Sequence, residues 1–231
     1  MKANANVIEF LERVADTALM VGIESILIEK QLIRGMDEAK TVAILQQVND
    51  IQLPFSAMGL TRASLFLSRL EIAKTRDNVT IDMELDKENV KIITFKSTGL
   101  KMDYRCGAPA TVQAPRQIND TMKYTINLNG EAVLLVQKAA SAMGSDLVSI
   151  VYNDKGVHFQ ITDITGDVFS YTLAKHADAL AHQGTDFSFN YPIKLLLTLF
   201  KQVPDSKIAI GAKGMLRVSV NGIDIYVLPR I

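Results

Sequence analysis

The sequence GLTRASLFLSRLEIAKTRDNVTIDMELDKENVKIITFKSTGLKMDYR, residues 59–105, holds one amphipathic helix followed by three short strands. A helix is predicted over residues 59–74, because Leu60, Ala63, Leu67 and Leu70 recur at helical spacing. Residues 79–85 then alternate between apolar and polar side chains, which is typical of a strand with one wet face. Turn sequences at 86–89 and 97–99 separate that strand from two more, at 90–95 and 100–105.

This unit of helix and strands recurs along the chain. Further helices are predicted at residues 6–20, 130–143 and 192–201, each with strands before or after it. The second half retraces the first at an offset of about 126 residues, so that Met36-Asp37 falls opposite Thr162-Asp163. Each half therefore contains two helices and about seven or eight strands. A chain that repeats itself in this way usually builds a symmetric object.

The fold class follows from how the strands are connected. Short turns between strands predict antiparallel sheets, and two helices in each half are too few to cover both faces of a parallel sheet. We therefore expect an α+β architecture of two similar domains. Residues 107–120, GAPATVQAPRQIND, have two prolines and no periodicity, which favours a connector. The expected division is an N-terminal domain 1–107, a connector 108–120 and a C-terminal domain 121–231.

Composition limits the partners and the location. The chain has 25 Lys and Arg against 25 Asp and Glu, so attraction to nucleic acid requires positive charge gathered on one face. One cysteine, Cys106, fits a reducing compartment. No stretch reaches the ~20 apolar residues of a membrane helix, and the first residues do not read as an export signal. We expect an intracellular protein of cytoplasm or nucleus, within a host cell if viral, with no membrane partner.

Signatures of enzymes are absent from the sequence. It has no GxGxxG, Walker loop, GxSxG or HExxH motif. His176 and His182 lie six residues apart and would need a third ligand to hold a metal. Cys106 is interpreted as a partly buried thiol, and Asp37 and Asp163 as turn residues that accept backbone N–H bonds. We predict no catalytic residue, no metal and no cofactor.

Basic side chains on the predicted helices offer a possible contact with phosphates. Lys194 and Lys201 share one face of the last helix, opposite its apolar residues. On any single helix, these basic residues are consistent with an ordinary solvent-exposed face. Because the helices repeat, the pattern favours a shared basic surface that contacts phosphates without sequence specificity. The candidate DNA-binding residues are Arg13, Arg62, Arg69, Lys74, Lys138, Lys194 and Lys201.

The chain as a whole resembles the two-domain sliding clamps of DNA replication, of the proliferating cell nuclear antigen and T-even phage type. The resemblance is carried by IRGMDEAKTVAIL (33–45), FSAMGLTRASLFLSRL (55–70), the 107–120 segment, YPIKLLLTLFKQV (191–203) and IDIYVLPRI (223–231). It implies a pseudo-sixfold ring of three copies with helices lining the hole. Such a ring would encircle double-stranded DNA without sequence preference and tether the replicative DNA polymerase, which makes synthesis processive. An ATP-dependent clamp loader is the implied partner for loading.

The resemblance also implies two protein interfaces. The subunit joint would be antiparallel strand pairing between copies, with the matching positions Leu100, Met102 and Tyr104 on one copy and Val168, Ser170 and Thr172 on the next. Partners of such clamps dock short hydrophobic peptides under the connector. The matching positions are Met36, Lys40, Thr41, Val112, Tyr226, Leu228 and Pro229. The first helix departs from the pattern, because Glu9, Glu12 and Asp16 surround Arg13.

Two alternatives stay open. A related ring or adaptor subunit for repair, checkpoint or transcription partners would share every feature above. A small-molecule enzyme with a cleft at the connector would need convergent polar groups, which the sequence does not show. The short chain and basic helices lean toward a phage or viral source.

Overall fold

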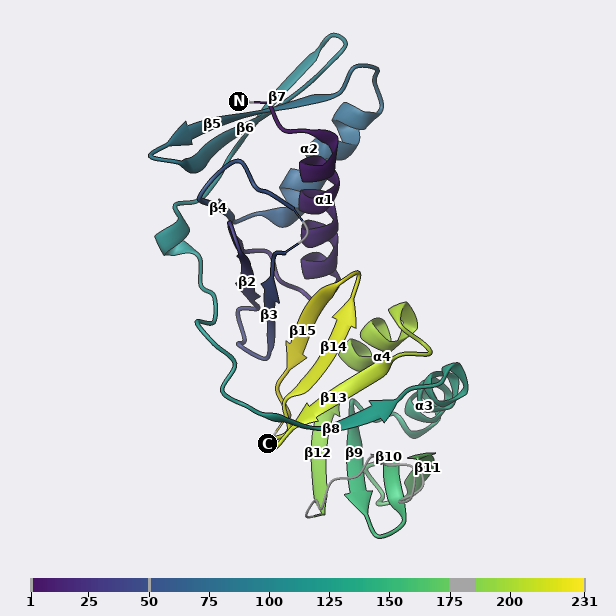
Figure 1. Ribbon diagram of the computed structural model, residues 1–231. Coiled ribbons are helices and arrows are strands. Elements are labelled where there is room, and N and C mark those ends of the chain that lie inside the picture. The colour runs from purple at the N-terminus through teal and green to yellow at the C-terminus, as the bar shows by residue number, and fades with distance from the viewer. Residues whose placement is uncertain (1, 50, 175–185, 231) are drawn as a thin grey trace. The chain divides into compact units, whose positions relative to one another are not determined.

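The computed structural model describes residues 2–49, 51–174 and 186–230, and the chain divides into two compact units (Figure 1). Unit 1 spans Met1–Ile118 and unit 2 spans Asn119–Ile231. Each unit is built from two α-helices and mostly antiparallel strands within the described residues, so the predicted α+β class is confirmed.

Two adjacent helices supply much of the core of unit 1. They are α1 (Ala5–Met20) and α2 (Ala63–Lys74), which contact each other along their lengths (Figure 1). The Asn4 side chain accepts a hydrogen bond from the Val7 N–H at 2.9 Å and so caps α1, because a helix start leaves its first N–H groups without backbone partners. The apolar stripe of α1 is fully buried at Leu11, Val14 and Ala15, as its helical spacing predicts.

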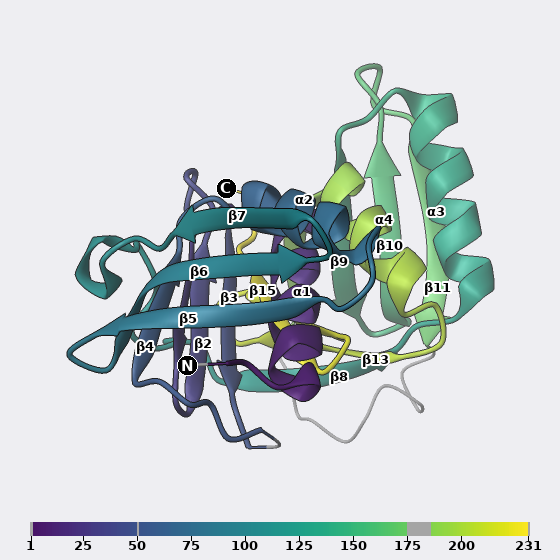
Figure 2. The same ribbon diagram turned by 90° about the horizontal axis from the view of Figure 1, so that it is seen from above.

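The strands of unit 1 form a sheet in the order β5-β6-β4-β1-β2-β3, with β7 also paired to β6. In Figure 2 strands β5, β6 and β7 lie side by side, with β7 at the edge. The strands are β1 (Ile26–Glu29), β2 (Leu32–Met36), β3 (Val42–Gln47), β4 (Ala57–Leu60), β5 (Thr80–Asp86), β6 (Asn89–Ser97) and β7 (Leu100–Arg105).

The structure corrects two details of the sequence interpretation. Residues 59 and 60 belong to strand β4, so helix α2 begins at Ala63, four residues later than predicted. The helical spacing of Leu60 was coincidental, since a short apolar run fits a buried strand equally well. The pairing of β4 with β6, at Ala57 and Asn89, is parallel, whereas the sequence predicted antiparallel pairing throughout.

Unit 2 repeats the plan with two four-stranded sheets and two helices. The helices are α3 (Gly130–Met143), capped by Asn129, and α4 (Ile193–Gln202). One sheet has the order β15-β14-β13-β8 and the other β11-β10-β9-β12. The strands are β8 (Met122–Asn127), β9 (Leu147–Asn153), β10 (Gly156–Thr162), β11 (Val168–Ala174), β12 (Phe187–Pro192), β13 (Lys207–Gly211), β14 (Leu216–Val220) and β15 (Ile223–Val227).

Equivalent aspartates organise one turn in each unit, as the repeat predicted. The Asp37 carboxylate accepts from the backbone N–H groups of Thr41 and Val42, both at 2.7 Å. The Asp163 carboxylate accepts from the N–H groups of Thr165 at 2.8 Å and Asp167 at 2.9 Å. Both side chains act as turn residues, so the prediction of a structural role for them is confirmed.

The segment after β7 is anchored to unit 1 by close backbone contact. It includes the short helix η1 (Pro109–Thr111). The Gly107 N–H donates to the Gly59 carbonyl at 2.9 Å, and a Cβ built on Gly59 would lie 2.6 Å from the Gly107 oxygen. Val112 packs over the same glycine and is only 9% exposed. Glycine is therefore required at position 59, because no side chain fits between the two backbones.

Candidate functional site

The helices of unit 2 present lysines without local acidic partners. Lys194 and Lys201 are exposed on α4, while Ile193, Leu196 and Phe200 on the same helix are buried. Lys138 is exposed on α3, which contacts α4. Within the described residues, none of these three lysines makes an ion pair closer than 4.0 Å. Their charges are therefore available to an anionic partner.

The helices of unit 1 have a different charge pattern. The Lys74 ammonium lies 2.5 Å and 2.6 Å from the two Glu12 carboxylate oxygens, so its charge is largely compensated. The pKa of the Asp16 carboxyl is raised from its ordinary value, first by burial and then by the neighbouring carboxylates of Glu12 and Glu71. Acidic side chains thus crowd α1 and α2, and a negative potential there opposes contact with phosphates.

Arg13 remains exposed on α1, with its guanidinium carbon 5.9 Å from the centre of the Phe10 ring. This contact is within the range of a cation–π interaction and leaves the charge at the surface. Arg13 is therefore the cation of α1 that could meet a phosphate.

Arg62, directly before α2, and Arg69 in α2 contact strand β7 of their own unit. The Arg69 guanidinium donates to the Asp103 carbonyl, and the Arg62 guanidinium donates to the Arg105 carbonyl at 3.4 Å. The Arg62 guanidinium also lies over the Tyr104 ring, 5.6 Å from its centre. The structure therefore brings these predicted DNA-binding residues to a sheet edge. No periodicity in the sequence could reveal contacts between residues that are more than thirty positions apart.

The predicted partner-binding residues of unit 1 lie around the end of β2. Met36 is half-buried, and Lys40 is exposed with a positive φ of 57° in the turn that follows. The Thr41 hydroxyl donates to the Asp37 carboxylate at 2.8 Å, so its side chain already has a partner. Val112 is buried by its own unit. Met36 and Lys40 are therefore the side chains here that a partner could reach.

The predicted partner-binding residues of unit 2 lie in strand β15, at Tyr226, and directly after it. Leu228 is 39% exposed, and Pro229 beside it is half-buried. The pKa of the Tyr226 hydroxyl is raised, first by burial and then by the Asp224 carboxylate. The Arg230 N–H donates to the Asn190 carbonyl at 2.8 Å, which holds the segment against unit 2. Leu228 is the clearest apolar contact point of this set.

The residues predicted at the subunit joint lie on two strands that have one neighbour each. Strand β7 pairs with β6, and β11 pairs with β10, among the described strands. Val168 is 58% exposed, Ser170 and Thr172 are exposed, and Leu100 and Met102 are half-buried. Tyr104 is fully buried against Phe66, with ring centres 5.8 Å apart. Its side chain is therefore not available to another copy, and its backbone groups point toward β6.

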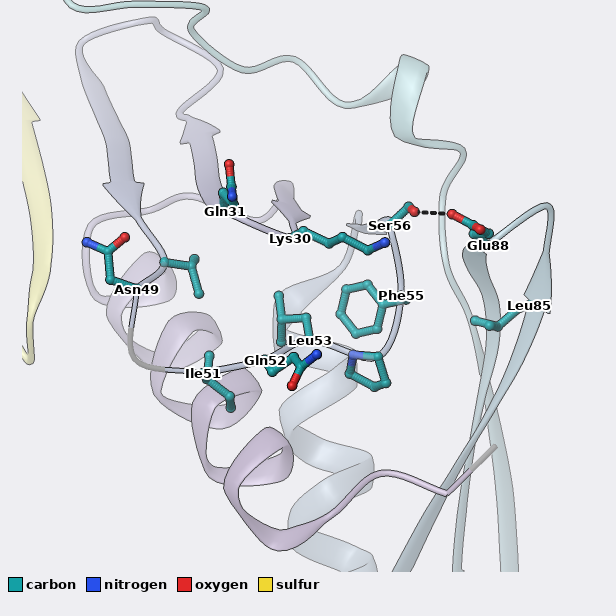
Figure 3. Close-up of a pocket in the computed structure, with 12 residues that line it drawn as sticks. Lys30, Gln31, Asn49, Ile51, Gln52, Leu53, Phe55, Ser56, Leu85 and Glu88 are labelled. Carbon is teal, nitrogen blue, oxygen red and sulfur yellow. Dashed lines mark hydrogen bonds between the residues drawn. The ribbon is translucent and has the colours of Figure 1, made fainter.

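A surface hollow of about 690 Å³ lies in unit 1 at the turn between β1 and β2 (Figure 3). Its walls include the buried side chains of Leu53 and Phe55. Lys30 and Glu88 are the charged side chains among its described lining, and the Glu88 carboxylate accepts from the Ser56 hydroxyl at 2.6 Å. The hollow lies at the opposite end of β2 from Met36. Its described lining holds no histidine and no cysteine.

The remaining reactive side chains have structural surroundings. The Cys106 thiol is half-buried, as the sequence predicted, and burial raises its pKa to about 12. The His158 ring lies 3.1 Å from the Thr172 hydroxyl and 3.2 Å from the Asn153 side-chain oxygen, and so bridges neighbouring strands. His176 and His182 lie outside the described residues. Within the described part of the chain, no group of three potential metal ligands occurs.

Among the described residues, no helix combines the length and the apolar character needed to cross a membrane.

Solved structures share this fold over nearly the whole chain. A structure of the C-terminal region of FEN-1 bound to A. fulgidus PCNA matches with a TM-score of 0.65 and 15% identity, covering 96% of each chain. PCNA from Thermococcus kodakaraensis matches with a TM-score of 0.61 and 14% identity, again covering 96% of each chain. A PCNA2–PCNA3 complex from Sulfolobus tokodaii matches with a TM-score of 0.58 and 15% identity, covering 96% of this chain and 95% of the other.

No protein-family model and no curated protein matches the sequence. At 14–15% identity the likeness shows the fold, and the chain has the fold of PCNA-type sliding clamps. The resemblance recognised in the sequence is confirmed at that level.

Proposed function

We propose that the chain is one subunit of a ring of three copies that encircles double-stranded DNA and tethers a replicative DNA polymerase. The observation that carries the proposal is the fold of PCNA-type clamps over 96% of the chain. Such a protein works as a binding scaffold in the cytoplasm or nucleus and needs neither a catalytic residue nor a cofactor. Processivity then comes from enclosing the DNA, so individual contacts can stay weak enough to permit sliding.

The proposed DNA contacts are unequal between the two units. Lys138, Lys194 and Lys201 supply uncompensated positive charge from α3 and α4. In unit 1, Arg13 contributes next to an acidic surface, and Lys74 adds little because Glu12 pairs with it. Phosphate contact therefore comes mainly from unit 2. Contacts of this kind carry no sequence information, which suits a protein that must slide.

Peptide partners are proposed to dock at the residues around Met36 and Lys40 in unit 1 and at Tyr226, Leu228 and Pro229 in unit 2. One support is the A. fulgidus PCNA structure, which holds the C-terminal region of FEN-1. A few apolar anchors usually dominate such docking, and exposed Leu228 is the best candidate here. The polymerase and an ATP-dependent clamp loader are the expected partners of this kind.

The test compares mass and DNA retention. Light scattering across a concentration series should give a species three times the 25.5 kDa chain mass. After loading, that species should stay on closed circular DNA and leave the same DNA once it is cut to a linear form. A monomer at every concentration that is retained on neither form would overturn the proposal.

A second candidate is a ring built from different chains, which serves repair, checkpoint or transcription partners. The match to a PCNA2–PCNA3 complex favours it, since that structure combines two clamp subunits. It predicts that this chain alone forms no trimer but assembles with a second clamp subunit of the same source.

A further inference from the structure

Strand β7 has one paired side and one open side among the described residues. The Cys106 N–H, directly after the strand, donates to the Lys91 carbonyl at 3.0 Å and therefore points toward β6. Backbone groups of successive residues point to opposite sides of a strand. The N–H and C=O groups of Lys101, Asp103 and Arg105 therefore point outward, away from β6.

The contacts of Gly107 agree with this assignment. Gly107 is the next residue of the outward row, and its N–H donates to the Gly59 carbonyl on the side away from β6. The outward row therefore continues along β7 as a set of groups that another strand can bond.

Two of the outward carbonyls are already occupied. Arg69 donates to the Asp103 carbonyl and Arg62 to the Arg105 carbonyl. We call Arg62 and Arg69 the edge arginines. An added strand would place its own N–H groups at the same two oxygens, so it has to displace both guanidinium groups.

The edge arginines are held in place by further contacts. The Arg62 N–H donates to the Tyr104 hydroxyl at 3.2 Å, and its guanidinium lies over the ring of that residue. Tyr104 in turn is fixed by burial against Phe66. Arg69 is half-buried, which restricts its side chain more than that of a fully exposed arginine. These positions follow from the packing of α2 against β7.

We propose that the edge arginines regulate strand addition at β7, and that the strand which displaces them is β11 of a second copy. The proposal rests on the ring proposed above. It assigns Arg62 and Arg69 to the subunit joint and removes them from the DNA-binding surface.

Charge complementarity favours β11 as the incoming strand. Strand β7 itself carries the cationic side chains of Lys101 and Arg105 and one carboxylate, that of Asp103. Residues 168–174 of β11 carry no charge, and Asp163 and Asp167 precede them. In an antiparallel pair the start of β11 meets the end of β7, so Asp167 would approach Arg105, a side chain that the Met variants keep.

The test removes the hydrogen-bond donors and keeps the apolar stems. Arg62→Met and Arg69→Met, singly and together, should lower the dissociation constant of the trimer by roughly three- to tenfold for each arginine, because the competing bond is absent. Sedimentation over a concentration series measures it. Arg62→Lys and Arg69→Lys, which keep the charge, are the matched controls and should lie between wild type and the Met variants. A dissociation constant that is unchanged or higher in the Met variants overturns the proposal.

DNA retention separates this role from a DNA-binding role. At concentrations where every variant is trimeric, the Met variants should stay on circular DNA as long as wild type. Faster loss of the Met variants from DNA, with unchanged assembly, would show that both arginines bind DNA. If the Met variants fail to fold, the Lys variants provide the test. Their weaker bonds to the two carbonyls should still lower the dissociation constant of the trimer. An unchanged dissociation constant in the Lys variants would contradict the proposal.

The same experiment distinguishes failure of the ring itself. If wild type is a monomer and the double Met variant is a trimer, the result would support the proposed role of the edge arginines. It would also show that the wild-type ring does not form unaided. Monomers in both would overturn both ideas. A wild-type trimer indifferent to the two arginines would overturn only this inference.

Discussion

At the scale of single residues, contacts decide which charges are available to a partner. Lys74 and Lys194 look alike in sequence, since each is a lysine on the polar side of an amphipathic helix. Lys74 is paired with Glu12, whereas Lys194 has no ion pair among the described residues. An exposed ion pair stabilises little, but it does compensate the charge that would attract a phosphate.

Charge reversal at Lys194 and Lys201 should weaken DNA retention and leave assembly unchanged. The double variant Lys194→Glu with Lys201→Glu is expected to bind DNA roughly tenfold or more weakly. The slope of log affinity against log salt concentration should become shallower by about 0.9 for each phosphate that is no longer neutralised. Retention on circular DNA at several salt concentrations measures both. Lys155→Glu, an exposed lysine in the turn between β9 and β10, is the control. Equal weakening in both variants would show a general charge effect.

Cys106 should be nearly inert in the folded chain. With a pKa of about 12, about one thiol in ten thousand is ionised at pH 8. Its reaction with a disulfide reagent should therefore be about a thousandfold slower than in urea, where an ordinary thiol pKa is restored. Fast labelling of the native chain would contradict this burial and reopen a nucleophilic role.

At the scale of elements, close approach between backbones ties the segment after β7 to strand β4. Gly59→Ala should lower the free energy of unfolding by about 1–3 kcal/mol, because its Cβ would meet the Gly107 oxygen at 2.6 Å. Chemical denaturation measures the change. Gly130→Ala is the control, since its nearest neighbour would be 3.9 Å away, and it should change stability by less than about 1 kcal/mol.

A substitution on the exposed strand β11 can test the subunit joint without lowering the stability of the single subunit. Val168 is 58% exposed, so Val168→Lys should alter subunit stability little, yet it would place a charge inside the proposed joint. We expect the dissociation constant of the trimer to rise roughly tenfold or more. Leu85→Lys, at a leucine 38% exposed in β5, should leave the mass at that of a trimer. Equal behaviour of the two variants would place the joint elsewhere.

Much of the fold could be predicted from periodicity, and little of the site could. The helix at 130–143 was predicted with its observed bounds, because an Asn cap and a following glycine mark its ends. Strand β4 was missed, since its four apolar residues suit a helix or a strand and only its neighbours β1 and β6 decide. The partners of Lys74, Arg62 and Arg69 depend on tertiary contacts that sequence spacing does not contain.

At the scale of the whole molecule, two units of similar plan carry different surfaces. Strands and helices follow in nearly the same order, and Asp37 and Asp163 organise equivalent turns. The helix surfaces nonetheless differ, with carboxylates on α1 and α2 and free lysines on α3 and α4. The two units therefore share a fold without sharing a charge pattern.

Assembly should show in the melting temperature. Association stabilises the folded state by mass action, so a tenfold rise in chain concentration is expected to raise the Tm by about a few degrees. Calorimetry at two concentrations measures it. In the Val168→Lys variant this rise should be smaller, because fewer chains are associated at both concentrations. A wild-type Tm that is independent of concentration would mean that folding and association are not linked.

The two open edges, β7 and β11, are unlike each other, which has a consequence for aggregation. When one end of a copy fits the other end of the next, each addition recreates the same two free ends, and head-to-tail growth can continue into a fibre. In the proposed ring, closure after three copies would consume both ends at once and leave no edge to extend. In such a ring, closure would prevent fibre growth even where the two edges bind each other strongly.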